Sequence, residues 1–327
     1  MTVTGPGPAS KIEIGERIAE RPLVAPNSSG LNFKFFAGDG YELGGTLFET
    51  AENSNPPIVA VFAGGGGVPA SRYRHFAKFL AEAGIPVLTF DYRGIGASRP
   101  LTLRGFPASA EDWSEFDCGG AISWLRARYP NAELVGIAHS IGTLIIGGAT
   151  SISELGRLIF IGAHTGYYGD YLPKHRLPMR FLWHTVMPAL TRIFGYFPAR
   201  LLGLGEDIPA GVAMQWAARR TPDLRPERTA PNASRARGML ARYAEIRVPA
   251  LALSFSDDAF ATPAGTRRLL ACYPGVLARF ELIVPGSKGL SRIGHFGFFR
   301  LGAEARLWPM VLSSIEAIGH KPLLSTT

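Results

Sequence analysis

The hydrophobic positions of this chain form short apolar runs that alternate with longer segments of helical periodicity. Two runs near the start, residues 33–37 and 41–49, flank the turn Gly38-Asp39-Gly40 and predict a β-hairpin. The later runs lack polar alternation, which is typical of strands buried on both faces of a sheet. These later runs are residues 57–63, 86–90, 133–138, 158–162, 250–255 and 280–284.

Segments with helical periodicity separate the apolar runs. They are residues 72–83, 110–128, 141–149, 262–272 and 303–318. Strands that alternate with helices predict an α/β fold, in which a mostly parallel sheet carries helices on both faces. The opening hairpin adds antiparallel strands at one edge.

Residues 164–247 break this alternation. They carry helical patterns at 179–194 and 210–219, several prolines and a linker at 221–236. The block is too long for a loop and too short for a separate fold, so it predicts an inserted helical cap over the sheet. The expected organisation is an N-terminal arm (1–30), a core (31–163 and 248–320), the cap insertion (164–247) and a tail (321–327).

Composition supports a globular protein and excludes several site types. A chain of 327 residues that is 46% hydrophobic can bury a large core. Its two cysteines, Cys118 and Cys272, have no CxxC or Cys/His cluster around them, so we expect buried thiols and no metal site. The N-terminus lacks the apolar segment of a secretory signal, and His139, Ser140 and four glycines interrupt the longest uncharged stretch, residues 134–153. We therefore expect no membrane span and a cytoplasmic location.

The positive charge is concentrated in the predicted cap. Thirteen Lys and Arg residues against six Asp and Glu residues lie between Thr165 and Arg247, a surplus of seven out of the net +8. No nucleic-acid-binding motif accompanies them, so no nucleic acid is expected as a partner. A solvated surface is one interpretation, and attraction of an anionic small-molecule substrate is the other.

The segment Ala138-His139-Ser140-Ile141-Gly142 joins an apolar run directly to a helical segment. Small residues around a serine at a tight strand-to-helix turn lift its hydroxyl clear of the sheet, beside a helix N-terminus that favours a developing anion. Ala138 replaces the more usual glycine and still leaves room for the turn. Ser140 is therefore the candidate nucleophile.

A serine nucleophile needs a base, which should follow the last strand of the sheet. His295 lies there, between glycines in Ser291-Arg292-Ile293-Gly294-His295-Phe296-Gly297. The other histidines come too early, lie in the cap or fall in the tail, and a structural role is expected for them: His75, His164, His175, His184 and His320. His139 adjoins the nucleophile, but its side chain should point away from the Ser140 hydroxyl.

An orienting acid should follow the penultimate strand, where Asp257 and Asp258 are adjacent. We favour Asp258, and Asp257 remains the alternative.

A tetrahedral intermediate also needs two N–H donors. Ile141 supplies one, and the glycine run 64–67 the other, with Gly65 preferred and Gly66 next. A phosphate-binding loop is excluded because no Lys-Ser or Lys-Thr follows these glycines.

Taken together, these motifs resemble the α/β-hydrolase superfamily, and within it the serine aminopeptidase-like and monoglyceride-lipase-like bacterial hydrolases. The resemblance rests on the glycine run, Asp91 to Ser98, Ala138 to Gly142, Asp257-Asp258 and Gly294 to Gly297. It implies an α/β-hydrolase fold and a Ser–His–Asp mechanism without a cofactor. Ala63 departs from the pattern, since many relatives have a histidine there.

The leading functional hypothesis is hydrolysis of a carboxylic ester or thioester of a small-molecule acyl substrate. Acyl transfer through the same intermediate and aminopeptidase-like amide hydrolysis remain alternatives, as does a non-catalytic binding module. Gly66, His139, Trp183 and Trp216 are candidates for substrate contact. The alternative for the cap aromatics is packing of the cap onto the core.

Overall fold

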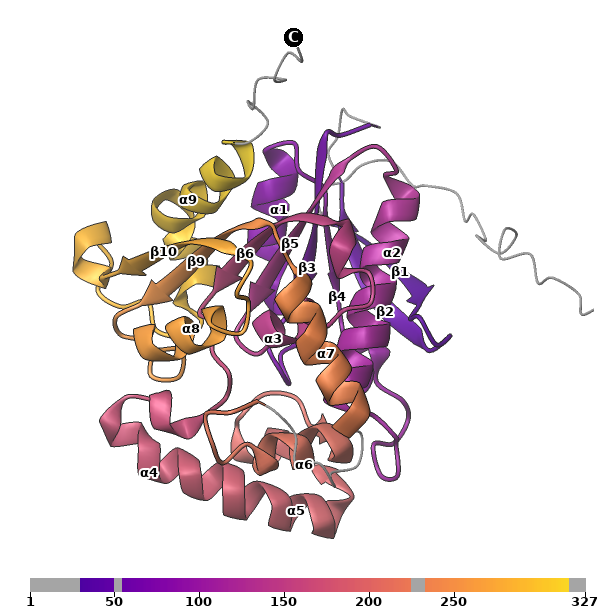
Figure 1. Ribbon diagram of the computed structural model, residues 1–327, viewed down its shortest axis with the longest axis vertical. Coiled ribbons are helices and arrows are strands. Elements are labelled where there is room, and N and C mark those ends of the chain that lie inside the picture. The colour runs from indigo at the N-terminus through magenta and orange to yellow at the C-terminus, as the bar shows by residue number, and fades with distance from the viewer. Residues whose placement is uncertain (1–29, 50–54, 225–232, 318–327) are drawn as a thin grey trace, which may run out of the picture.

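The computed structural model describes residues 30–49, 55–224 and 233–317. The described residues form an eight-stranded sheet in the order β1-β2-β4-β3-β5-β6-β9-β10, with helices on both faces (Figure 1). Within this sheet, only the β1–β2 and β2–β4 pairs are antiparallel. This confirms the predicted fold. The strands are β1 (Leu31–Phe36), β2 (Glu42–Phe48), β3 (Ile58–Ala63), β4 (Val87–Phe90), β5 (Glu133–His139), β6 (Leu155–Ile161), β9 (Pro249–Phe255) and β10 (Leu277–Ile283).

The central strands are buried on both faces, which explains their continuous apolar runs. In β3, Val59 and Val61 pack into one core cluster, whereas Ala60 and Phe62 pack into the other. Helices α1 (Arg74–Glu82) and α9 (Glu304–Glu316) cover the second cluster. Helices on the first face are α2 (Gly119–Arg128), α3 (Gly142–Gly147), α7 (Ala233–Glu245) and α8 (Pro263–Leu270).

The insertion after β6 lies below the sheet in the view of Figure 1. It contains α4 (Pro173–Phe181), α5 (Met187–Phe194), a short hairpin of β7 (Tyr196–Phe197) and β8 (Ile208–Pro209), and α6 (Ala210–Ala218). A π-helical segment, Leu182–Val186, joins α4 to α5, so the helical stretch begins earlier than the pattern predicted. The amide of Glu206, beside the hairpin, donates to the Gly67 carbonyl at 2.8 Å. The insertion therefore sits against the glycine run that follows β3.

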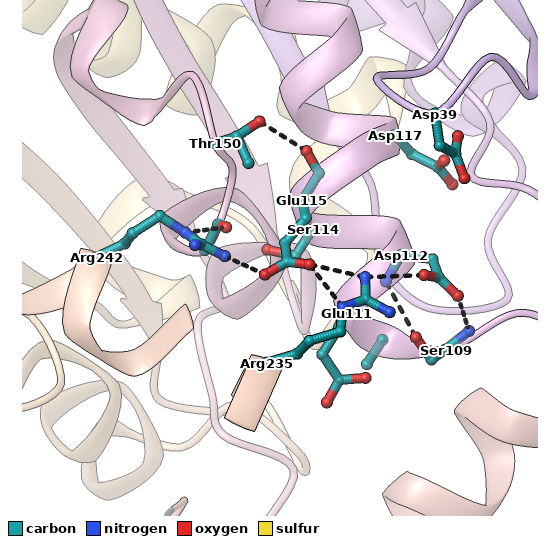
Figure 2. A network of polar contacts seen from close by, with 12 residues as sticks. Asp39, Ser109, Glu111, Asp112, Ser114, Glu115, Asp117, Thr150, Arg235 and Arg242 are labelled. Carbon is teal, nitrogen blue, oxygen red and sulfur yellow. Dashed lines mark hydrogen bonds and ion pairs between the residues drawn. The ribbon is translucent and has the colours of Figure 1, made fainter. Parts of the chain in front are cut away.

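Helix α7 was not predicted, and it packs on the core although the sequence placed it in the cap. Figure 2 shows Arg235 and Arg242 of this helix reaching the π-helical segment Asp112–Cys118. Arg235 pairs with Asp112 at 2.9 Å and with Glu115 at 2.7 Å, and Arg242 pairs with Glu115 at 2.7 Å. The chain thus returns to the core before residue 247.

Several sequence-based expectations fall partly or wholly outside the described residues. These are most of the N-terminal arm, the tail, and residues 225–232 of the expected linker. Cys118 is buried and Cys272 half-buried, both as free thiols. None of the helices in the described part of the chain combines the length and apolar character that a membrane span needs.

Candidate active site

Ser140 lies on a strained turn between β5 and α3. Its φ of 57° makes it the only non-glycine residue with a positive φ in the described part of the chain. Such strain persists only where the surroundings over-determine it, and it clusters at functional sites. Gly142 is required by packing, since a Cβ there would lie 2.4 Å from the carbonyl oxygens of Ala63 and Gly64. The small residues around Ser140 are thus explained by this turn.

Three of the predicted residues meet in one hydrogen-bonded chain. The Ser140 Oγ lies 2.9 Å from His295 Nε2, and His295 Nδ1 lies 2.8 Å from Asp258 Oδ2. Asp258 is fully buried, and its Oδ1 accepts the amides of Phe260 and Ala261 at 2.9 Å each. Burial alone would raise the pKa of Asp258, but the His295 contact and the two amides outweigh it and hold this pKa below its ordinary value. An ionised carboxylate on Nδ1 leaves Nε2 free to accept the serine proton.

Asp257, the alternative acid, binds backbone amides rather than the His295 imidazole. Its carboxylate accepts the amides of Ile293 and Gly294, both at 2.9 Å. These two residues directly precede His295 in the chain. The structure therefore places Asp258 against the imidazole and Asp257 at the base of the loop that carries it.

A second histidine also contacts the nucleophile, and the sequence analysis assigned it a structural role. His164 Nε2 lies 3.0 Å from Ser140 Oγ, while His164 Nδ1 accepts the Gly166 amide at 2.9 Å. Because Nδ1 is an acceptor, the proton of the neutral ring resides on Nε2 and points at the serine. Burial lowers the pKa of His164 to about 3, so the ring stays neutral near neutral pH. His164 can donate to Oγ but cannot take its proton.

His139 lies behind the site rather than in it. It is fully buried, its Nδ1 lies 3.0 Å from the Tyr73 hydroxyl, and its Nε2 lies 3.0 Å from the His295 carbonyl. The Tyr73 hydroxyl in turn accepts the Gly65 amide at 2.8 Å. The carbonyl can only accept, so Nε2 carries the proton and Tyr73 donates to Nδ1. This chain of bonds ties the glycine run to the His295 loop.

The Gly65 amide, the preferred candidate of the sequence analysis, is therefore already engaged with Tyr73. Neither the Gly66 amide nor the Ile141 amide has a hydrogen-bond partner among the described residues. Trp216 of α6 lies against this region, because a Cβ on Gly66 would be 3.2 Å from its ring. Trp183 packs on Trp216, with ring centroids 5.2 Å apart. Trp216 thus contacts the glycine run from the insertion, and Trp183 contacts Trp216.

A cavity of about 200 Å³ opens beside His295. Phe260 and Phe296 form its apolar walls, and Arg292 and Arg300 lie at its edge. Ser140 is not among the residues that line it.

Comparisons with known proteins agree with this architecture. Residues 54–191 match the family model described as serine aminopeptidase, S33. Lysophosphatidylserine lipase ABHD12 of Rattus norvegicus is 33% identical over 97 residues, which are 29% of this chain and 23% of that protein. The chain thus aligns with only about a quarter of the length of this curated relative.

Two solved structures share the fold along nearly their whole length. The esterase Pf2001 of Pyrococcus furiosus aligns with a TM-score of 0.56 and 15% identity, over 93% of this chain and 99% of that one. The monoacylglycerol lipase of Paleococcus ferrophilus aligns with a TM-score of 0.55 and 14% identity, over 84% and 98%. The sheet order and these structural matches together show that the chain has the α/β-hydrolase fold.

Proposed function

We propose that the protein is a serine hydrolase that cleaves a carboxylic ester or thioester through an acyl-enzyme on Ser140. The observation that carries this proposal is the unbroken chain from Ser140 Oγ through His295 to Asp258, at 2.9 and 2.8 Å. These distances are within hydrogen-bond reach for a nucleophile, its base and the group that orients the base. A purely binding role would not require a strained serine held against an aligned imidazole.

In the first half-reaction, Ser140 Oγ attacks the substrate carbonyl as His295 Nε2 takes its proton. The carbonyl oxygen becomes an anion that the amides of Gly66 and Ile141 are positioned to bind. The resulting imidazolium is stabilised by Asp258 and then gives its proton to the departing alcohol or thiol. The acyl group remains on Oγ.

In the second half-reaction, His295 takes a proton from water, which attacks the acyl carbon, and the imidazolium returns that proton to Oγ as the acid leaves. Here Oγ is the leaving atom and gains negative charge. The Nε2–H of His164, 3.0 Å away, stabilises that charge and also fixes the direction of the hydroxyl in the resting enzyme. We assign His164 to this donor role.

A panel of p-nitrophenyl esters with acyl chains from acetate to dodecanoate tests the proposal. The wild type should hydrolyse part of this panel, and Ser140→Ala should lower kcat/KM by roughly 10³-fold or more. The exposed serine variant Ser123→Ala is the matched control and should retain wild-type rates. Hydrolysis by Ser140→Ala at the wild-type rate would contradict the mechanism.

A further inference from the structure

Among the described residues, no carboxylate contacts the guanidinium of Arg219, just after α6. The one hydrogen bond of this guanidinium to a described residue runs from Nη1 to the Thr165 carbonyl, at 3.0 Å. Glu111 acts on it only through space, because the Glu111 carboxylate binds Gln215 Nε2 at 2.5 Å. Burial lowers the pKa of the Arg219 guanidinium. Withdrawing a cation from water is costly when no carboxylate contacts it directly, and a bound anionic ligand would supply that contact.

Two further polar groups close to Arg219 lack partners. Thr165 Oγ1 and Trp216 Nε1 are buried, and neither has a hydrogen-bond partner among the described residues. Most buried polar side-chain atoms in proteins are hydrogen-bonded, so unpaired ones are available to bind a ligand. An indole N–H and a guanidinium are donors only, and a threonine hydroxyl can donate as well. All three groups therefore suit a ligand rich in acceptor atoms.

Two of these groups, Arg219 and Trp216, converge at Gly166, the residue that follows Thr165. A Cβ on this residue would lie 3.8 Å from Arg219 Nη1, 3.8 Å from Trp216 Cε2 and 3.8 Å from Ile141 Cδ1. Cε2 is the ring atom bonded to the indole nitrogen, so the N–H edge of Trp216 meets the guanidinium here. Gly166 has a φ of 80°, a conformation that favours glycine, and the glycine keeps this point clear of a side chain.

This point lies next to the nucleophile. Gly166 donates its amide to His164, which contacts Ser140 Oγ. The opposite edge of the Trp216 ring, at Cζ3, lies 3.2 Å from where a Cβ on Gly66 would be. One indole ring therefore spans the distance between the Gly66 amide and Arg219. The cavity beside His295 is lined by neither Trp216 nor Arg219.

We propose that Arg219, Trp216 Nε1–H and the Thr165 hydroxyl form a subsite for a carboxylate at the far end of the substrate's acyl group. The inference rests on the proposed serine hydrolase function and narrows its substrate to esters or thioesters of short dicarboxylic acids. A guanidinium can bind both oxygens of a carboxylate, and the single charge of that group balances Arg219. The width of one indole separates the substrate carboxylate from the acyl carbon. The chain that joins them therefore contains only a few carbon atoms.

The test compares p-nitrophenyl hemiesters of succinic, glutaric and adipic acid with neutral p-nitrophenyl esters of equal chain length. The wild type should prefer at least one hemiester over its neutral counterpart. Arg219→Gln should lower kcat/KM for that hemiester by roughly 10- to 100-fold, mainly through KM, and change the neutral ester less than about threefold. Arg220→Gln, which removes the same charge at the exposed neighbouring residue, should leave both substrates unchanged.

The outcomes separate this subsite from the catalytic proposal. A hemiester preference that survives Arg219→Gln, or no preference in the wild type, would overturn the subsite. An equal loss on both substrates would also overturn it and assign Arg219 a structural role, which a lowered melting temperature would report. If neutral esters are hydrolysed only when Ser140 is present, the serine hydrolase proposal stands in every one of these cases.

Discussion

Replacement of His164 by asparagine separates its two hydrogen bonds. The Nδ1 atom accepts the Gly166 amide at 2.9 Å, and Nε2 donates to Ser140 Oγ at 3.0 Å. An asparagine places its side-chain oxygen near the position of Nδ1 and can keep the first bond, but it is too short to reach Oγ. A glutamine reaches the position of Nε2 and can restore the donor. Comparison of His164→Asn with His164→Gln therefore tests the hydrogen bond to Ser140 Oγ separately from the hydrogen bond that holds the Gly166 loop.

The expected loss follows from the value of one hydrogen bond to an atom that gains charge. Such bonds contribute about 1.5–3 kcal/mol, which corresponds to a rate factor of roughly 10 to 150. Because the charge on Oγ develops most as the acyl-enzyme breaks down, deacylation should slow more than acylation. His164→Asn should show this loss, with a burst of p-nitrophenol before a slower steady state, and His164→Gln should recover part of it.

The pH profile distinguishes a donor from a base. The pKa of His164 is already lowered to about 3 by burial, so its removal should leave the acid limb of kcat/KM unchanged. His295→Asn, in contrast, should lower kcat by roughly 10³-fold or more at every pH. A wild-type rate for His164→Asn would refute the donor role. Disappearance of the acid limb in this variant would instead make His164 the base.

Two further predictions concern the neighbouring acids and histidines. Asp258→Asn should lower kcat by roughly 10³- to 10⁴-fold because it changes the imidazole tautomer. Asp257→Asn only weakens the anchor of the His295 loop and should lower kcat by about tenfold or less. Similar losses of kcat in the two variants, measured on one ester, would contradict their separate roles. Burial lowers the pKa values of both His139 and His164, so the unfolded chain binds more protons below pH 6.5. The free energy of unfolding should therefore fall as the pH falls from about 6.5 toward 3, by up to ~1.4 kcal/mol per pH unit for each ring. Urea denaturation at several pH values between 7 and 5 measures how steeply the free energy of unfolding depends on pH. This dependence should be weaker for His164→Asn than for the wild type. An unchanged dependence on pH would argue against a neutral buried His164 ring.

The sequence analysis selected three residues that the structure brings together, because each of them follows the end of a strand. Ser140, Asp258 and His295 each follow an apolar run, and parallel strands bring their carboxyl ends to one edge of the sheet. The choice between Asp257 and Asp258 could not be made from the pattern, since adjacent residues in a loop point in different directions. The choice between Gly65 and Gly66 depended on the Tyr73 hydroxyl, which comes from a separate segment.

His164 could have been found by the same strand-end rule. It lies three residues after β6, at the edge that carries Ser140, yet its position at the start of the cap favoured a structural interpretation. Arg219 gave no such signal. Only the structure, in which Arg219 lies beside Thr165 and Gly166, shows that no carboxylate among the described residues contacts its guanidinium. The helical pattern of α7 was missed because it follows a polar linker, and its docking depends on Asp112 and Glu115, more than a hundred residues away.

Covalent labelling tests directly whether Ser140 is an activated nucleophile. A fluorophosphonate forms a stable bond with an activated serine, and intact-mass measurement followed by peptide mapping identifies the labelled residue. We expect one adduct per chain, located on Ser140, with labelling abolished in Ser140→Ala and strongly slowed in His295→Asn. Labelling of another residue, or equal labelling of wild type and Ser140→Ala, would contradict this expectation.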